Sequence, residues 1–192
     1  MKLFLCCLGL LAVLSLRAVE PVRVLLTTRL GEIEVELYPE RAPGTVQNFL
    51  HYVDEGFYDG GVFYRAATMA NQPANKIKIE VIQAGQNPAR EGEELPPITL
   101  ERTRDTGLKH LDGTISMARL EPDTATSDFF ICVNDQPELD FGGERNPDGQ
   151  GFAAFGQVIR GMDVVRAIQR SPVEVQKLTP PITIVQASRL KN

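Results

Sequence analysis

The feature that most constrains the fold of this sequence is a succession of short, β-rich apolar runs, each bounded by turn-forming residues. The chain has 192 residues, and its 16 glycines and 13 prolines are spread along its length. Strands of this length, separated by glycine and proline, are typical of antiparallel sheets. The runs lie at residues 22–28, 32–37, 62–65, 78–83, 98–100, 114–118, 129–133, 153–159 and 182–186. We therefore predict a mainly β domain with roughly eight strands.

Two segments interrupt this series with apolar residues at helical spacing. The first covers residues 42–56, where Thr45 is expected to cap the beginning of a helix and Gly56 to end it. The second covers residues 162–169. Short strands and two helices together predict a closed eight-stranded antiparallel barrel capped by the helices. An open β-sandwich is the alternative.

The first 18 residues have the pattern of an export signal. One lysine precedes an apolar run from Leu3 to Leu16, and cleavage is expected after Ala18, although Leu16 and Arg17 are unusual residues for a cleavage site. An apolar run of this length is too short to span a bilayer comfortably. We predict a signal peptide at 1–18 and one mature domain at 19–192, exported to the periplasm or secreted, with no stable membrane insertion.

Charge and cysteine content narrow the classes of function. Removing the signal leaves 18 basic and 25 acidic residues, a net charge of −7, which argues against a nucleic-acid-binding surface. Cys6 and Cys7 lie in the signal, so Cys132 is the only thiol of the mature chain and no internal disulfide is expected. Cys132 lies in the apolar stretch FFICV, where a buried, unreactive thiol is expected.

Several short motifs are better explained by structure than by chemistry. The stretch GQGFAA at 149–154 matches a dinucleotide-binding spacing, but a loop precedes it and a strand follows it. The residues NPDG at 146–149 predict a turn and lack the ligand spacing of an EF-hand. The only histidines, His51 and His110, are expected to be packing or surface groups, which argues against a metal site. Neither a serine nucleophile elbow nor a carboxylate pair supports hydrolysis.

Seven segments, in this order, resemble a cyclophilin: GFYDGGVFYR (56–65), VIQAG (81–85), LKH (108–110), GTISMA (113–118), SDFFI (127–131), ELD (138–140) and FAAFGQVIRGMDVV (152–165). The resemblance covers nearly all of the mature chain. It implies an eight-stranded barrel with two helices that isomerises X-Pro bonds in proline-containing polypeptide clients. It also implies a packed interior, which disfavours a lipocalin-like ligand-binding barrel.

The chemistry of X-Pro isomerisation explains why such a protein needs an arginine and few other catalytic groups. Loss of amide resonance creates a barrier of about 18–20 kcal/mol and leaves the proline nitrogen pyramidal. A fixed cation whose hydrogen bonds strengthen as the bond twists lowers that barrier. Arginine suits this role because it is always charged and rigidly forked. We therefore expect no cofactor, metal or ATP.

The resemblance assigns roles to individual residues. Arg65 takes the catalytic arginine position and Gln83 that of the glutamine that steadies it. Without the resemblance, Arg65 would be interpreted as a strand-end residue reaching to water. The substrate groove would have Phe130 as the floor of the proline pocket, with its remaining residues being Val81, Ala118, Arg119, Leu139 and Phe152.

The chain departs from the family between the catalytic arginine and the glutamine. Seventeen residues, 66–82, replace a short apolar connection, so an inserted loop is expected to overhang the pocket. Glu80 occupies the position of a pocket-edge phenylalanine and could pair with Arg65.

Three substitutions are expected to make the groove rim more charged. Glu138 occupies the position of the family's tryptophan or phenylalanine, so we expect weak or no cyclosporin binding. Arg119 replaces an asparagine and Asp128 a glutamine. One hypothesis is an isomerase that selects clients with charged residues beside proline. The alternative is a catalytically weak chaperone or interaction module that binds proline segments.

Overall fold

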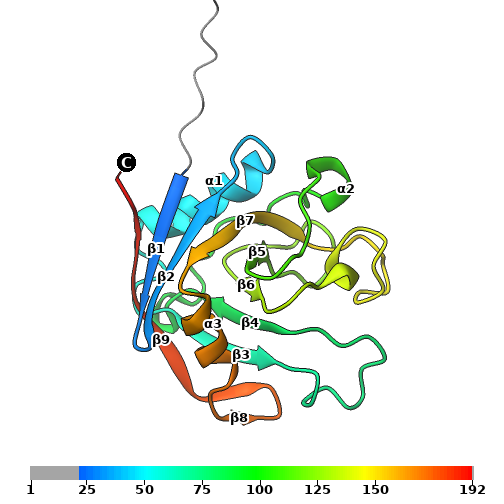
Figure 1. Cartoon of the computed structure of the whole chain (residues 1–192). Coiled ribbons are helices and arrows are strands. Elements are labelled where there is room, and N and C mark those ends of the chain that lie inside the picture. The colour runs from blue at the N-terminus through cyan, green and yellow to red at the C-terminus, as the bar shows by residue number, and fades with distance from the viewer. Residues whose placement is uncertain (1–21, 192) are drawn as a thin grey trace, which may run out of the picture.

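In the computed structural model, which describes residues 22–191, eight antiparallel strands close into a barrel (Figure 1). Their order is β1-β2-β7-β5-β6-β4-β3-β9, and β9 pairs back with β1. Closure confirms the predicted barrel, and the sandwich alternative is wrong. The bounds are β1 Val22–Thr28, β2 Gly31–Leu37, β3 Val62–Ala67, β4 Val81–Gly85, β5 Thr114–Met117, β6 Phe129–Cys132, β7 Ala153–Arg160, β8 Val173–Glu174, which pairs only with β9, and β9 Lys177–Arg189.

Three of the predicted strands differ from the observed ones by more than two residues. The predicted 78–83 strand is observed as β4, Val81–Gly85. The other two differences involve proline. Residues 98–100 form only an isolated bridge from Ile98 to Ala125, following Pro96 and Pro97, which have no N–H for a sheet ladder. β9 begins at Lys177, five residues before the predicted start at 182. Pro180 and Pro181 lie at an irregularity in the pairing of β9 with β3. Phe63 is opposite Ile182, but Arg65, two residues on, is opposite Lys177. A bulge of this kind tolerates residues that cannot donate to the ladder.

The two predicted helices are confirmed as α1 (Pro43–Asp54) and α3 (Met162–Gln169), and a single further turn forms α2 (Thr103–Thr106). Two 3₁₀ turns, η1 (Pro88–Arg90) and η2 (Pro137–Leu139), lie in the connections. No helix of the described residues is both long enough and apolar enough to cross a membrane. The predicted signal peptide lies outside the described residues.

The beginning of α1 is capped from a distant segment, so the predicted Thr45 cap is wrong. Thr45 lies within the first turn, and its buried Oγ1 has no hydrogen-bond partner among the described residues. Instead the carboxylate of Glu101 accepts hydrogen bonds from the backbone N–H groups of Gly44 (3.1 Å) and Thr45 (2.8 Å). Gly56 follows the helix with a positive φ of 66°, which confirms the predicted end.

We expect Glu101→Ala to lower the free energy of unfolding by about 1 kcal/mol, because two N–H groups of α1 lose their acceptor and the negative charge at the helix N-terminus is removed. Urea unfolding would measure the change. Glu91→Ala is the matched control, since Glu91 is exposed and its side chain makes no hydrogen bond to the described residues. Equal stability of the two variants would contradict the capping role.

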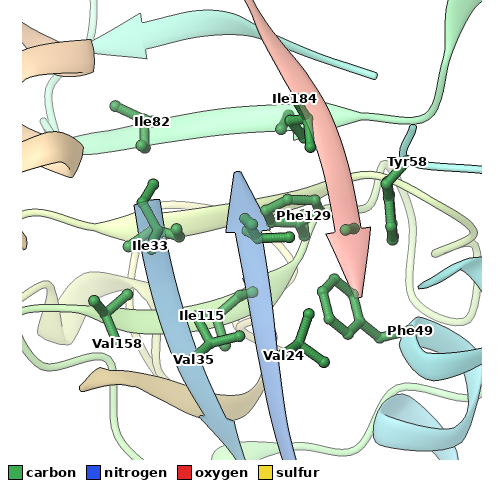
Figure 2. Close-up of a cluster of buried hydrophobic side chains, with 14 of the residues drawn as sticks. Val24, Ile33, Val35, Phe49, Tyr58, Ile82, Ile115, Phe129, Val158 and Ile184 are labelled. Atoms are coloured by element: carbon green, nitrogen blue, oxygen red, sulfur yellow. The ribbon is translucent and has the colours of Figure 1, made fainter. Parts of the chain in front are cut away.

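The barrel interior is filled by side chains that point inward from the strands and from α1 (Figure 2). Phe49 of α1 packs against Tyr58, Phe129 and Phe155, with ring centroids 5.1–5.4 Å apart. Aliphatic side chains complete the cluster, among them Val24, Ile33, Val35, Ile82, Ile115, Val158 and Ile184. A ligand-binding barrel needs an open interior, so the lipocalin-like alternative is wrong.

Three smaller sequence predictions are confirmed. Cys132 is buried, as predicted, and burial raises the pKa of its thiol well above the ordinary value, which favours the protonated, less nucleophilic form. The N–H of Gly149 donates to the carbonyl of Asn146 (3.0 Å), which closes the predicted turn. The GQGFAA stretch leads directly into β7 and opens no helix.

Candidate functional site

A second apolar cluster lies on the outer face of the barrel, opposite the core. Successive residues of a strand point to opposite faces, so Phe129 of β6 enters the core and Phe130 joins this outer cluster. Both are almost fully buried. The outer cluster contains Ala67, Ile79, Val81, Phe130, Cys132, Leu139 and Phe152.

A cavity of about 170 Å³ opens on this cluster. The structure places around it every site residue predicted from the sequence: Arg65, Val81, Gln83, Ala118, Arg119, Phe130, Leu139 and Phe152. Three residues that were not predicted, Ile79, Arg145 and Asn146, complete its lining. The cavity thus has an apolar floor with arginine and amide groups around it.

Arg65 is held in place by two amide side chains. β3 and β4 place Arg65 directly opposite Gln83. Its Nη1 donates to Gln83 Oε1 (2.7 Å), and its Nε donates to Gln176 Oε1 (2.8 Å). Within residues 22–191, no carboxylate lies within ion-pair distance of Arg65. Burial lowers the pKa of this guanidinium from its ordinary value, but an arginine so placed stays charged.

A hydrogen-bonded chain continues from Gln83 away from the cavity. Gln83 Nε2 donates to the hydroxyl of Tyr64, which donates to Asp128 Oδ2 (2.6 Å). Burial raises the pKa of the Asp128 carboxyl, and burial followed by the charge of Asp128 raises the pKa of Tyr64. Gly85 allows the Asp128 carboxylate to lie close to the β4 backbone, because a Cβ at position 85 would collide with Asp128 Oδ1. Asp128 therefore orients Gln83 through Tyr64. Its carboxylate was predicted to add charge to the groove rim, but in the structure it is bound to the Tyr64 hydroxyl.

Gln176 is a residue of the candidate site that sequence reasoning missed. It follows Val175 in the β8–β9 turn, and the N–H of Ala66 donates to its backbone carbonyl (2.9 Å). Val175 has a φ of 59°, a left-handed conformation that a β-branched residue rarely adopts. Nothing in the local sequence marks Gln176, because it approaches Arg65 only through the pairing of β9 with β3, 111 residues along the chain.

Arg119 braces a loop instead of presenting its charge to the groove. Its side chain is only 1% exposed and pairs with Asp148 (2.7 Å). Its Nε and Nη2 also donate to the carbonyl of Gly151 (2.8 and 2.6 Å), and the guanidinium lies 5.1 Å from the ring centroid of Phe152. The hydrogen bond from Arg119 lowers the pKa of the Asp148 carboxyl. The prediction that Arg119 adds charge to the rim is therefore wrong.

Glu80 and Glu138 are also engaged elsewhere. Glu80 accepts a hydrogen bond from Asn134 Nδ2 (2.9 Å) and does not pair with Arg65, so that prediction is wrong. The preceding residue, Ile79, lines the cavity instead. Glu138 is half-buried and accepts from the backbone N–H of Glu144 (2.8 Å), which uses its carboxylate within the 141–151 loop.

The inserted segment forms one wall of the cavity. The buried amide of Gln72 donates to the carbonyls of Thr68 (2.8 Å) and Ile79 (2.6 Å), which ties the two ends of the loop together. The loop extends from the β3–β4 end of the barrel (Figure 1). It brings Ile79 to the cavity and the carbonyl of Ile77 to Arg145, whose Nη1 donates to it (2.6 Å).

His110 supports the cavity floor from behind. Its ring stacks on Phe130, with centroids 5.9 Å apart. Burial lowers the pKa of His110, so the ring is neutral: Nδ1 donates to Asp140 Oδ1 (2.8 Å), and the Ser116 hydroxyl donates to Nε2 (2.9 Å). Hence His110 is a packing group, as predicted, while His51 is exposed on α1. The described residues hold no cluster of three or more metal-ligating side chains.

We expect the stability of the fold to fall as the pH drops below about 6.5. Burial lowers the pKa of His110 in the folded state, so in this pH range the histidine binds a proton more readily in the unfolded chain than in the folded one. Urea unfolding at pH 7.5 and 5.5 would measure this slope. In His110→Gln the contribution should vanish, so the variant should lose less stability over that interval than the parent. An unchanged pH slope in the variant would contradict a neutral, buried His110.

Comparisons with known proteins agree with this geometry. A protein-family model described as cyclophilin type peptidyl-prolyl cis-trans isomerase/CLD matches residues 23–189. The peptidyl-prolyl cis-trans isomerase A of Dickeya dadantii is 39% identical over 93% of this chain and 94% of its own length. A peptidyl-prolyl cis-trans isomerase of Acinetobacter baylyi is 38% identical over 83% of this chain and 78% of its own.

Solved structures support the fold. The crystal structure of a cyclophilin type peptidyl-prolyl cis-trans isomerase from Cryptosporidium parvum superposes with a TM-score of 0.72 at 22% identity, covering 90% of this chain and 99% of that one. The barrel, the matched family model and the curated relatives lead to one conclusion: this chain belongs to the cyclophilin family of peptidyl-prolyl cis-trans isomerases.

Proposed function

We propose that this protein accelerates the cis/trans isomerisation of X-Pro bonds in exported polypeptides, and that Arg65 stabilises the twisted imide. The observation that carries the proposal is the placement of Arg65 beside an apolar cavity, held by Gln83 and Gln176 and without a carboxylate partner among the described residues. A preorganised cation of this kind stabilises charge that develops only as the bond twists.

The cavity suits a proline ring. Its volume of about 170 Å³ is smaller than the roughly 300–1,000 Å³ of drug-sized pockets. Phe130 and Phe152 meet edge to face, with centroids 5.4 Å apart, and supply an apolar seat. Burial of the ring there anchors one end of the X-Pro bond while the preceding residue rotates.

Arg65 has donors to spare for the substrate. A guanidinium carries five N–H donors, and the structure uses one on Nε and one on Nη1. The remaining donors are available to the proline nitrogen or the neighbouring carbonyl. Since Gln83 and Gln176 hold the guanidinium plane from two sides, little reorganisation is needed as the bond twists.

The isomerisation rate of an Ala-Pro peptide, measured by NMR exchange at substoichiometric protein, tests the proposed activity. We expect exchange to accelerate in proportion to protein concentration. No acceleration by a folded protein would overturn the catalytic proposal, and binding of the peptide in the same sample would then favour the proline-segment-binding module.

Export is the second part of the proposal and is supported by the signal-like pattern of residues 1–18. Fusing these residues to a reporter that is active only outside the cytoplasm would test it, with a fusion in which Leu8→Arg and Leu11→Arg interrupt the apolar run as the control. We expect activity only from the first fusion. Equal activity from both would contradict export.

Cyclosporin is expected to bind weakly or not at all, with a dissociation constant that is not submicromolar. Glu138 takes the place of the family's tryptophan, and its carboxylate is committed to the N–H of Glu144. Calorimetric titration would measure the affinity, and Glu138→Trp should strengthen it. Submicromolar binding by the unmodified protein would contradict this expectation.

A further inference from the structure

Arg145 is a second cation at the cavity to which the mechanism above gives no role. It lies in the 141–151 loop and lines the same cavity as Arg65. Its side chain makes one described hydrogen bond, from Nη1 to the carbonyl of Ile77 (2.6 Å). In the part of the chain that the structure describes, no carboxylate lies within 4.0 Å of its nitrogen atoms.

The positive charges of Arg65 and Arg145 act on each other. Burial lowers the pKa of Arg145, and the charge of Arg65 lowers it further. Arg119, the third arginine of the cavity lining, differs because Asp148 neutralises it. The chain as a whole carries a net charge of −5, so this cavity is a local positive site on an acidic protein.

An anion at the cavity mouth would relieve this repulsion. Clefts lined by one sign of charge concentrate ligands of the opposite sign, and a carboxylate pairs well with a forked guanidinium. The cavity has room for little more than one proline ring, so such an anion belongs to a residue beside the proline and not to the ring that fills the floor.

We propose that Arg145 is a specificity-determining residue that selects proline segments with a carboxylate next to the proline. This inference rests on the proposed isomerase function and names its preferred substrate class. The carboxylate is supplied either by an aspartate or glutamate side chain adjacent to the proline or by a chain terminus at the proline itself. The inserted segment takes part, since the Ile77 carbonyl holds Arg145 in its place.

Matched peptides test the proposal. One amidated set places Glu or its neutral isostere Gln before the proline, a second set places them after it, and a third pair ends at proline with a free or amidated carboxyl group. We expect kcat/KM to be about tenfold higher for the carboxylate member of at least one pair, the effect of a hydrogen bond to a charged group. A preference in the first or second set would identify a side-chain carboxylate as the anion, and a preference in the third would identify the chain terminus. The preference should shrink in 1 M NaCl, where charge is screened within about 3 Å.

Variants of Arg145 assign the preference to this side chain. In Arg145→Gln the ratio of kcat/KM between the carboxylate and neutral peptides should fall to about one, whereas Arg145→Lys should keep part of it because the charge remains. Arg160→Gln is the matched control, since Arg160 is exposed, pairs with Glu34 and does not line the cavity. It should keep the full ratio.

The outcomes separate the two levels of the proposal. Catalysis with equal kcat/KM for carboxylate and neutral peptides would overturn the role of Arg145 and leave the isomerase function standing. A preference that survives in Arg145→Gln would likewise overturn the assignment. No catalysis on any peptide would instead overturn the proposed function.

Discussion

Arg65→Ala is expected to lower kcat/KM for X-Pro isomerisation by about one to two decades, because the hydrogen bonds of a charged donor to the twisted imide are each worth about 1.5–3 kcal/mol. The loss should fall mainly on kcat, since the contact strengthens in the transition state. Peptide exchange measured over a range of substrate concentrations would separate kcat from KM.

Arg65→Lys separates charge from geometry. Lysine keeps the positive charge but has no planar fork, so it cannot reproduce the contacts that Nε and Nη1 make to Gln176 and Gln83. We expect activity between those of the parent and of Arg65→Ala. If both variants stayed within twofold of the parent while keeping its urea midpoint, Arg65 would not be the catalytic cation.

Phe129→Ala and Phe130→Ala are expected to have opposite consequences although the two residues are neighbours. Phe129 is fully buried and packs against Phe49, Tyr58 and Phe63 at 5.3–6.0 Å between ring centroids. Its truncation should lower the free energy of unfolding by about 3–5 kcal/mol through cavity formation. Phe130 belongs to the smaller outer cluster, so its truncation should cost less stability.

Catalysis should follow the reverse order. Phe130 forms the cavity floor between His110 and Phe152, and losing it removes the surface on which a proline ring would rest. We expect Phe130→Ala to raise KM and lower kcat/KM at least tenfold, a loss of about 1.4 kcal/mol. Folded Phe129→Ala, measured at low temperature, should keep most of its kcat/KM. An equal loss of activity in both variants would contradict the division of β6 into a core face and a substrate face.

The strand and helix pattern was largely predictable because it depends on local properties. Alternation in β2 and helical spacing in α1 and α3 are visible in short windows of sequence, and the structure confirms all three elements. The cap of α1 was not predictable in this way. Thr45 has the chemistry of a cap, but Glu101, 56 residues further along the chain, supplies the acceptor.

The candidate site was predictable only through the resemblance to a family. Arg65, Gln83 and Phe130 carry no local signal strong enough to separate them from strand residues that serve packing or solvation. Side chains that approach the site from the connecting loops and turns were missed. Ile79 and Arg145 reach the cavity from two separate connections, and Gln176 reaches Arg65 from a third. None of the three stands in a segment that carries the resemblance.

The substituted charges show where tertiary structure decides. Sequence reasoning placed Arg119, Asp128 and Glu138 on the groove rim as free charges, but each has a partner in the fold: Asp148, Tyr64 and the N–H of Glu144 respectively. A charge becomes available to a substrate only after the partners within reach are counted, and those partners lie on other loops and strands. By that count the unpaired cations at the cavity are Arg65 and Arg145, within residues 22–191.

By itself, the sequence determined that this chain forms a mainly β domain with two helices, because alternation, helical spacing and turn residues act over a few positions. The choice between barrel and sandwich depended on the tertiary pairing of β9 with β1, which closes the sheet. With the family resemblance the sequence also indicated which strand ends bear the arginine and the glutamine. Only the tertiary structure decided which charges face the cavity, because pairing of β3 with β9 and folding of the 66–82 and 141–151 loops bring together residues far apart in sequence. The strength of an electrostatic interaction depends on the distance between two charges in space, and the separation of two residues along the chain does not reveal that distance.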